Sequence, residues 1–300
     1  MDRLQTMSVF VSVAEEAGFA PAARRLNMSP PAVTRAVSEL EGRLGCRLLH
    51  RTTRSVRLTE AGERYLADCR RILSEVDAAD RHAAGLHAAP SGTVTVTASR
   101  MFGRTVLTPV LGDLLNRYPD LTVSALFADR VVHLLDEGID VAVRIAELPD
   151  SSLSAVRVGS VRRVLCAAPG YLAAQGRPAM PDDLSRHRLI NFVNMTPGGE
   201  WRLERDGRRH SVRPRARLLL NTADAAIDAA VAGGGITRVL SYMIADRIAD
   251  GTLESVLPDY EPPAVPVHVV HKEAGQTSAR VRAVVDHFVE RLRKSPALEP

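Results

Sequence analysis

Arginine has the clearest chemical pattern in the sequence, because it gathers at one end of the chain. Through Leu58 there are nine Arg and five acidic residues, so this segment carries the whole formal net charge of +4. Five Arg and no acidic residue lie between Arg43 and Arg57. A cationic end on a neutral body is typical of a protein that binds a polyanion. The alternative is a basic surface that only contacts water.

A second group of polar residues follows predicted strands in the second half of the chain. Ser99 and Arg100 come directly after a strand predicted at 93–98, and Arg144 lies near the end of one predicted at 140–145. Ligands of open α/β sheets bind beyond the carboxyl ends of the strands, where a helix N-terminus and an arginine both favour a carboxylate. These residues therefore predict a site for a small organic anion.

If three phenylalanines, Phe102, Phe127 and Phe192, line that site, they favour an anion with an aromatic ring. The alternative is that they belong to the core and that Arg144 pairs with an acidic residue such as Asp129. Both interpretations stay open, because Phe is among the residues most often buried.

Residues for catalysis or metal binding show no comparable pattern. The sequence has no GxSxG, HExxH, P-loop or GxGxxG motif, and its nine His have no metal-ligand spacing. The cysteines, Cys46, Cys69 and Cys166, lack CxxC spacing, which argues against a disulfide framework or a cysteine zinc site. We expect neither an enzyme nor a bound metal or cofactor.

The composition, 45% hydrophobic and 25% charged, is that of a globular protein and excludes global disorder. No apolar run approaches the ~20 residues that a membrane span requires, and no signal peptide is evident at the N-terminus. We therefore expect a cytoplasmic protein whose 300 residues form two or three domains.

The N-terminal arginines fall on a predicted helix pair. Apolar spacing predicts a helix over 3–17, a short one over 21–26, and a third that begins after Ser29, a good N-cap. Pro30 and Pro31 fit only the first turn of that third helix, which Gly45 ends. Its buried stripe is predicted to consist of Val33, Val37, Leu40 and Leu44.

The opposite face of this third helix carries small and polar residues, namely Ala32, Thr34, Arg35 and Ser38. A second helix with such a face is suited to enter the major groove of DNA. After it, residues 47–51 and 55–58 are predicted to pair as a hairpin with an Arg-rich tip at 52–54. That hairpin suits contacts to phosphates or the minor groove, and its alternative is a hairpin exposed to solvent.

A long helix is predicted from Thr59 to about Leu86. Its apolar seam repeats every four and three residues, a pattern that indicates pairing between two chains. The alternative is an amphipathic helix that lies on its own chain. The seam consists of Tyr65, Cys69, Ile72, Val76, Ala79, Ala83 and Leu86.

Beyond a hinge at 88–92 the pattern changes to alternating strands and helices, which predicts α/β structure with a largely parallel sheet. After the strand at 93–98 we expect a helix at 105–118, a strand at 121–127 and a helix at 131–137. Two extended crossings at 157–168 and 264–271 would enclose a second lobe, and a final helix at about 278–294 would return to the first. Two lobes joined by two crossings make a cleft.

The sequence resembles the LysR-type transcriptional regulators over essentially its whole length. The N-terminal match includes Phe19, Ala22 to Leu26, Ser29 to Arg35, Leu40-Glu41, Leu44-Gly45, Leu48 to Arg54 and Leu58 to Gly62. The second half is similar to one large subgroup at Arg144 to Leu153, Pro169 to Leu172 and Gly233 to Ile236. The family usually has serine at Gly18 and serine or threonine at Ala20.

The resemblance implies a homo-oligomer, commonly a tetramer, that binds promoter DNA and responds to a small molecule held between the two lobes. It assigns DNA contacts to Ser29, Pro30, Pro31, Ala32, Thr34, Arg35 and Ser38 on the groove-reading helix, and to Arg51 and Arg54 on the wing. It assigns the effector pocket to Ser99, Arg100, Met101, Phe102, Phe127, Arg144, Phe192, Asn194, Asn221, Thr222 and His271.

The fold expected from this resemblance is α/β and multidomain. A winged helix-turn-helix occupies 1–58, a linker and dimerisation helix 59–88, and a two-lobed α/β domain like the type 2 periplasmic binding proteins 92–300. Within that domain, lobe 1 takes 92–161 and 267–300, and lobe 2 takes 162–266. A solute-binding protein and an enzyme with a DNA-binding tether are the other two classes considered. The first 58 residues and the absence of an evident signal peptide count against the solute-binding protein, and the absence of a catalytic motif counts against the enzyme.

Overall fold

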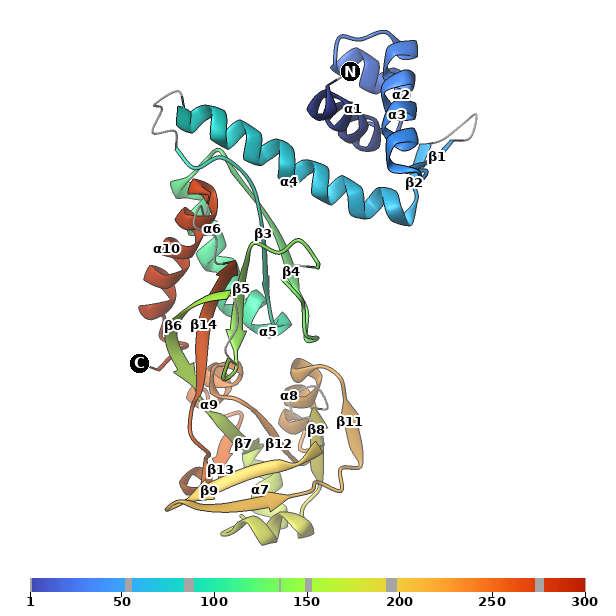
Figure 1. Ribbon diagram of the computed structural model, residues 1–300. Coiled ribbons are helices and arrows are strands. Elements are labelled where there is room, and N and C mark those ends of the chain that lie inside the picture. Colours follow the sequence, from blue (N-terminus) through green and yellow to red (C-terminus); the bar gives the residue numbers. More distant parts are fainter. Residues whose placement is uncertain are drawn as a thin grey trace. The chain divides into compact units, whose positions relative to one another are not determined.

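The computed structural model describes residues 2–51, 56–83, 89–134, 136–148, 153–192, 199–272 and 278–299. The chain divides into two compact units, Met1–Ala89 and Pro90–Pro300. The first unit, here called the head, contains α1 (Arg3–Glu15), α2 (Phe19–Arg25), α3 (Pro30–Leu44), β1 (Leu49–Arg51), β2 (Val56–Leu58) and α4 (Glu60–Ala83), as Figure 1 shows.

The predicted helices of the head are confirmed with small shifts at their ends. The first ends at Glu15 because Ala17 takes a positive φ of 49° directly before Gly18. The second begins at Phe19, so Pro21 stands at its third position, where a backbone N–H would still have no acceptor within the helix. Gly18 caps this helix without a side-chain hydrogen bond.

The head packs around one apolar core, and the first half of α4 belongs to it. Phe10 and Cys69 are both fully buried there, and Tyr65 and Ile72 pack against the same cluster. The rings of Phe10 and Tyr65 lie 5.8 Å apart. The prediction of a seam between chains is therefore wrong for Cys69, which the head buries, whereas Tyr65 and Ile72 are half-buried against the same core.

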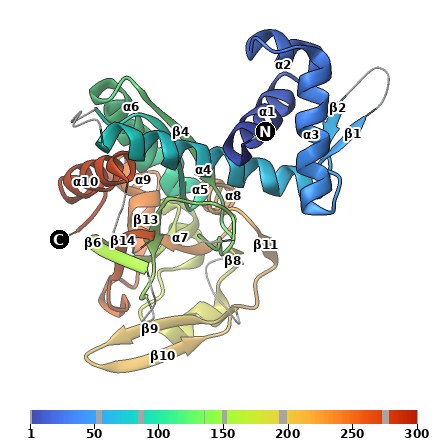
Figure 2. The same cartoon turned by 45° about the horizontal axis from the view of Figure 1, so that its top comes forward.

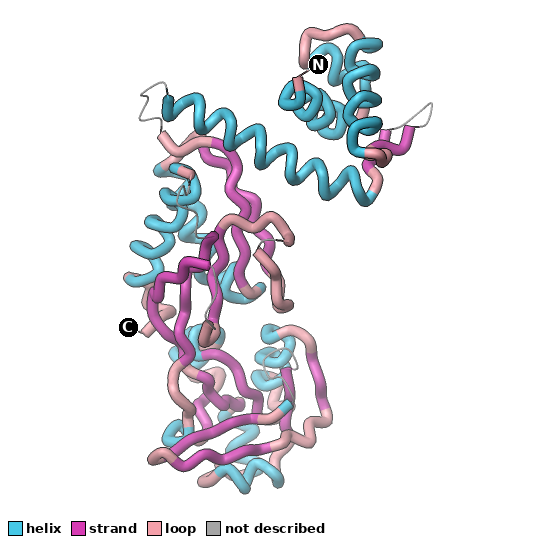
Figure 3. Tube along the Cα trace, in the orientation of Figure 1, coloured by secondary structure: helices cyan, strands magenta, loops and turns pink. Residues whose placement is uncertain are grey.

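The second unit, here called the effector domain, contains two five-stranded sheets, each forming one lobe (Figures 1 and 3). The sheet of lobe 1 has the order β4 (Leu121–Phe127), β3 (Gly92–Ala98), β5 (Val141–Ile145), β14 (Val265–Lys272), β6 (Leu153–Val161). The sheet of lobe 2 has the order β11 (Leu218–Leu220), β8 (Leu189–Phe192), β12 (Ile236–Leu240), β7 (Arg163–Ala167), β13 (Glu254–Val256). A separate ribbon in lobe 2 pairs β9 (Trp201–Arg205) with β10 (Arg208–Val212).

The helices of the effector domain lie between these strands along the chain. They comprise α5 (Arg100–Phe102), a π-helical turn at Gly103–Leu107, α6 (Thr108–Arg117), α7 (Pro169–Gln175), α8 (Ala223–Val231), α9 (Ala245–Ala249) and α10 (Ala279–Arg293). Short 3₁₀ turns occupy Pro181–Arg186, Ser241–Met243 and Pro258–Tyr260.

The sheets are mixed, which corrects the prediction of a largely parallel sheet. β3 runs parallel to β4 and β5, but β14 runs antiparallel to β5 and β6. The physical reason is connectivity, because β6 leads out of lobe 1 and β14 leads back into it. The two crossings were recognised from their extended apolar runs, but not the direction in which they pair.

The helix predicted at 131–137 is also wrong, because the described residues there form turns. The carboxylate of Glu137 accepts hydrogen bonds from the backbone N–H of His133 (3.1 Å) and from the Arg130 guanidinium (2.8 Å), which holds a compact loop. The final helix is confirmed as α10, and Val284, Phe288 and Leu292 are buried in the core of lobe 1. In the part of the chain that the structure describes, no helix is long and apolar enough to cross a membrane.

Candidate functional sites

The start of α3 has the geometry that its sequence predicts. The Oγ of Ser29 accepts a hydrogen bond from the backbone N–H of Ala32 (3.4 Å), and the two prolines occupy the first turn. Gly45 ends the helix in the left-handed conformation with φ 70°. Val33, Val37 and Leu40 are fully buried together with Ala36, which the predicted stripe omitted.

The opposite face of α3 is open to solvent. The exposed residues are Ser29, Pro30, Pro31, Thr34, Arg35 and Ser38, and Ala32 is half-buried beside them. Thr34 Oγ1 donates to the carbonyl oxygen of Pro30 (3.0 Å), which leaves its methyl group on the surface. The predicted groove-reading residues therefore share one accessible face of one helix.

A hairpin follows α3, and a carboxylate fixes it to that helix. The backbone N–H groups of Leu48 and Leu49 both donate to Glu41 Oε1, at 2.9 and 3.1 Å. In the β1–β2 register His50 lies opposite Arg57, and both are exposed. Sequence reasoning missed Arg57 and His50 as candidate contacts, although their alternation with buried Leu49 is the signal that identifies them.

The basic residues of the head differ in whether they bond to other side chains of the head. Arg43 donates to Thr6 Oγ1 (2.8 Å), and Arg25 forms ion pairs with Glu15 (2.9 Å) and Glu16 (3.2 Å). These bonds raise the pKa of Arg25 above its ordinary value, chiefly through Glu15. Both arginines therefore hold the head together. The side chain of Arg51 and the whole of Arg54 lie outside the described residues.

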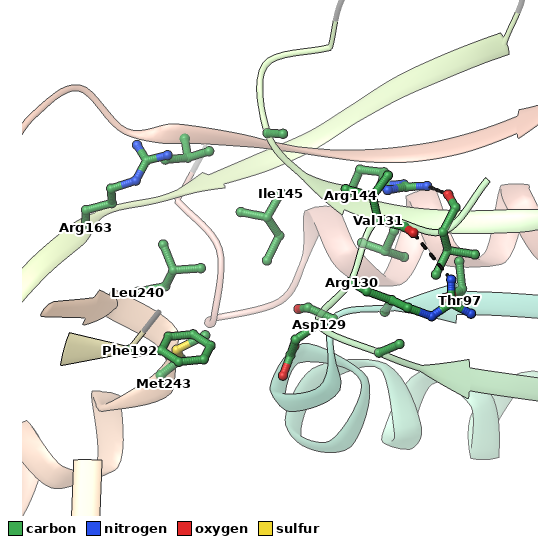
Figure 4. A pocket seen from close by; sticks show the side chains of 17 residues that line it. Thr97, Asp129, Arg130, Val131, Arg144, Ile145, Arg163, Phe192, Leu240 and Met243 are labelled. Carbon is green, nitrogen blue, oxygen red and sulfur yellow. Dashed lines mark hydrogen bonds between the residues drawn. The ribbon is translucent and has the colours of Figure 1, made fainter. Parts of the chain in front are cut away.

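A cavity of about 280 Å³ lies between the lobes of the effector domain (Figure 4). Its volume suits a small organic molecule. The ends of β3 and β5 and the loop after β4 form the lobe 1 wall, and the ends of β7, β8 and β12 contribute the lobe 2 wall. The lining residues are Thr97, Ala98, Ser99, Ala128 to Val132, Val143 to Ala146, Arg163, Phe192, Leu240, Met243 and Val265.

Two arginines reach this cavity from different lobes. Arg144, on β5, donates to the carbonyl oxygen of Val132, and Arg163 comes from the first position of β7. Figure 4 shows them on opposite sides of the space, with Ile145 between them and Leu240 and Phe192 below Arg163. The Arg144 guanidinium is turned toward the Val132 carbonyl. Burial lowers the pKa of both guanidinium groups, and the nearby charge of Arg202 lowers that of Arg163 further.

Arg163 was missed at the level of sequence. It stands in an apolar strand, where a charged residue is unusual unless it has a partner or a ligand. That exception to the strand pattern is the signal that could have identified it. Arg130 also lines the cavity, but its guanidinium binds Glu137, which lowers the pKa of that carboxyl to about 2.

The helix N-terminus after β3 is already occupied by a carboxylate of the chain itself. Asp129 Oδ1 accepts from the backbone N–H of Arg100 (2.9 Å), and the Arg100 side chain is exposed and lies 4.0 Å from the same carboxylate. The anion-binding role predicted for this terminus is therefore filled by Asp129. Ser99 does line the cavity, and its neighbour Tyr242 has a pKa raised by burial.

Of the three phenylalanines, the structure places only Phe192 in the lining. Phe102 is fully buried and meets the Tyr242 ring edge-on at 5.3 Å. Phe127 covers Gly103, where an added Cβ would lie 2.3 Å from the ring, so the two residues pack directly. Both pack in the core of lobe 1, which agrees with the alternative prediction that the phenylalanines are core residues.

The remaining predicted pocket residues lie outside the lining of this cavity. Met101 packs against the apolar cores of both lobes. Thr222 is the N-cap of α8 beside Asn221, and its hydroxyl helps to lower the pKa of Asp224. His271 Nδ1 lies 3.0 Å from the carbonyl oxygen of Lys272. Asn194 falls outside the described residues.

Among the residues that the structure describes, no group of three His, Cys, Asp or Glu side chains could hold a metal ion. Cys69 and Cys166 are buried free thiols, and burial raises their pKa to about 11 and about 12 respectively. The arrangement offers an exposed helix face and a cationic cavity rather than a nucleophile with a base.

Two protein families match the chain in sequence. Residues 4–63 match the bacterial regulatory helix-turn-helix protein, lysR family, and residues 87–293 match the LysR substrate binding domain. The activator AaeR of Escherichia coli is 35% identical over 97% of this chain and 95% of its own length. A transcriptional repressor of Pseudomonas aeruginosa is 34% identical over 100% of this chain and 95% of its own length.

The fold is also similar to a solved structure. CrgA, described as a LysR-type transcriptional regulator from Neisseria meningitidis, superposes with a TM-score of 0.62 at 29% identity, covering 96% of this chain and 98% of that chain.

Proposed function

Because the chain belongs to the LysR family of DNA-binding transcriptional regulators, we propose that it binds promoter DNA sequence-specifically as a homo-oligomer and that a small organic anion modulates this binding. The observation that carries the proposal is the exposed face of α3 above a fully buried stripe. A regulator of transcription acts on the chromosome. We therefore propose that the protein works in the cytoplasm and catalyses no reaction.

The DNA-reading part of the proposal rests on the head. Ser29, Thr34 and Ser38 supply hydroxyl groups for base edges and phosphates, and Arg35 supplies a guanidinium suited to guanine or phosphate. Pro30, Pro31 and Ala32 bring the backbone close to the groove with little side-chain bulk. Arg57 and His50 on the hairpin, with Arg51 and Arg54, are proposed for the phosphates or the minor groove.

The oligomer is proposed to form through the second half of α4, beyond the residues that pack on α1. Val76 is the first residue of the predicted seam that lies outside the head's core. Ala79, Ala83 and Leu86 continue that seam, and their side chains lie outside the described residues. A dimer fixes the spacing of two reading helices, and a tetramer follows from the family resemblance.

The effector proposal rests on Arg144 and Arg163, which present two guanidinium groups to one cavity with an apolar middle. Such a cavity suits an organic anion whose acidic group binds an arginine and whose body contacts Phe192, Ile145 and Leu240.

We test the function by titrating the full-length protein into labelled DNA from upstream of its own gene, at two salt concentrations, with unrelated DNA as competitor. Binding that survives the competitor supports the proposal and supplies an operator for screening organic anions. Arg35→Gln should weaken this binding and reduce the salt slope by about one unit if Arg35 contacts a phosphate.

Arg25→Gln is the matched control, since it removes the same charge from the head but from an arginine tied to Glu15 and Glu16. Equal effects of the two substitutions would show that overall charge, and not the α3 face, governs binding. Binding lost to competitor with every upstream fragment, and with fragments from the rest of the genome, would contradict sequence-specific recognition.

A further inference from the structure

Lobe 2 carries a concentration of positive charge outside both the DNA-reading head and the residues that line the cavity. Residues 200–217 contain seven Arg and three acidic residues, a formal excess of +4 that equals the excess of residues 1–58. All seven arginines are exposed, and they are Arg202, Arg205, Arg208, Arg209, Arg213, Arg215 and Arg217. We call this segment the basic ribbon.

Residues 201–212 of the basic ribbon form a hairpin with a fixed register, and residues 213–217 follow it outside any strand. Asp206 and Gly207 take positive φ values of 51° and 73°, as a two-residue type I′ turn requires, and they join β9 to β10 directly. On its inner face Trp201 and Leu203 are buried in the core of lobe 2. Trp201 Nε1 also donates to Asn191 Oδ1 (3.3 Å), so the ribbon is anchored along its length.

The outer face presents arginines in a regular row. From Arg209 to Arg217 every odd-numbered residue is exposed and every even-numbered residue is half-buried. Four of the five odd positions are Arg, namely 209, 213, 215 and 217. Alternate residues of an extended chain stand about 6.7 Å apart, and two phosphates of one DNA strand, each a rise of about 3.4 Å along the helix axis, cover a similar length of that axis.

The acidic residues of the basic ribbon only partly offset this charge. Glu200 lies 3.8 Å from Arg202 and 3.9 Å from Arg213, and Glu204 lies 3.6 Å from Arg209. The side chains of these three arginines remain 82–89% exposed. Such loose, solvated pairs contribute little energy, so the arginines can exchange them for another anion.

We propose that the basic ribbon binds the phosphate backbone of double-stranded DNA without reading its sequence. The effector domain would then contribute its own electrostatic contact to the affinity that the head provides. Figure 2 shows β9 and β10 at the end of this domain opposite β4 and α6.

A regular polyanion fits these residues better than a single-stranded nucleic acid. Single-strand binding relies on aromatic side chains that stack on bases, and the exposed row has none. The nearby Tyr260 is already engaged, because the Arg205 guanidinium lies 5.2 Å from its ring centre and His210 meets the ring edge-on.

The test compares three full-length proteins on a duplex of unrelated sequence, with the dissociation constant measured at several salt concentrations. The ribbon variant combines Arg213→Gln, Arg215→Gln and Arg217→Gln. The matched control combines Arg104→Gln, Arg186→Gln and Arg247→Gln, exposed arginines of the same domain outside the ribbon. We expect the ribbon variant to lower the slope of log K against log salt by two to three units, about 0.9 per phosphate contact, and to bind at least tenfold more weakly at low salt.

The control should keep the wild-type slope. A ribbon variant with the slope of the control would overturn the proposal. If that variant instead lost retention on immobilised poly-glutamate while its DNA slope stayed unchanged, the ribbon would be a surface for an acidic protein and not for DNA. If the head recognised no operator, the salt slopes of the ribbon variant and the control could still be compared, because both triple variants keep the same head.

Discussion

Arg144 and Arg163 illustrate how neighbours decide the role of a charged residue. Both line the cavity, and burial lowers the pKa of both guanidinium groups. Arg130 lines the same cavity but is bound to Glu137, and Arg43 in the head is bound to Thr6. We therefore propose Arg144 and Arg163 for a ligand, although Arg144 also donates to the Val132 carbonyl oxygen, and we assign Arg130 and Arg43 to the stability of the fold.

At these residues we expect Arg144→Gln and Arg163→Gln each to weaken the binding of an anionic effector by about 10- to 100-fold, since a hydrogen bond to a charged group contributes about 1.5–3 kcal/mol. The measurement is calorimetric titration with an anion found in the operator screen. Arg104→Gln, at an exposed arginine of the same domain outside the lining, serves as the control and should change the affinity by less than threefold. An unchanged affinity in both cavity variants would place the effector elsewhere.

Gly62 is required because two backbones approach closely. A Cβ at this position of α4 would lie 2.0 Å from the carbonyl oxygen of Leu48. Gly42, within α3, has no heavy atom within 4 Å of the corresponding point. The same substitution should therefore have opposite effects at the two sites.

We predict that Gly62→Ala lowers the melting temperature of the head and its DNA affinity together, because the β1 end of the hairpin must shift. Gly42→Ala should stabilise the head by about 0.5–1 kcal/mol, the ordinary gain of alanine over glycine inside a helix. Thermal unfolding followed by circular dichroism measures both. Equal melting temperatures for the two variants would contradict the close approach.

At the scale of elements, we propose that α4 serves the head and the oligomer in succession. It spans 24 residues, about 36 Å at about 1.5 Å per residue, and its described side chains that pack in the head's core run from Tyr65 to Leu73. The heptad spacing is continuous along the helix, so periodicity cannot show where the partner changes. The burial of Cys69 and the packing of Ile72 against the same core place that point after Leu73.

We expect Ile72→Lys and Val76→Lys to differ for this reason. Ile72→Lys buries a charge against the head's core and should lower its melting temperature by several degrees. Val76→Lys should leave the head folded and convert the oligomer to a monomer. Analytical ultracentrifugation and thermal unfolding separate the two effects, and a Val76→Lys variant with unchanged mass would move the interface elsewhere.

At the scale of the whole molecule, α10 closes lobe 1 with residues from the end of the chain. His287 is 3% exposed on this helix, and its Nε2 lies 3.5 Å from Asp113 Oδ2 on α6. Arg291 also contacts Asp113 (3.0 Å), and Arg117 lies nearby. Burial lowers the pKa of His287 below its ordinary value, and the attraction of Asp113 opposes that effect.

This buried histidine predicts a pH dependence of stability. Because its pKa is lower in the folded than in the unfolded protein, its contribution is complete above about pH 6.5 and is lost as the pH falls toward the folded pKa. The effector domain should therefore lose stability between pH 7.5 and pH 5.5, and His287→Gln should reduce that loss. Urea unfolding at both pH values measures it, and identical losses would contradict the assignment.

The sequence by itself determined the elements of the head, most of those of lobe 1 and the final helix, in their order along the chain. Ser29 followed by Pro30 and Pro31 fixed the start of α3, and the apolar spacing identified which face of that helix is buried. These are local signals, because caps, prolines and periodicity act within a few residues. The basic excess of residues 1–58 and the two extended crossings were also visible, so a DNA-binding head and a two-lobed domain could be predicted.

Only the tertiary structure decided which of these residues meet. It buried Phe102 and packed Phe127 against Gly103, placed Arg163 and Arg144 on opposite walls of one cavity, and filled the helix N-terminus at Arg100 with Asp129. It also showed that the first half of α4 belongs to the head and that the crossing strands pair antiparallel. The physical reason is that contacts between distant segments depend on the packing of both lobes, and no pattern within one segment of the sequence records its partner.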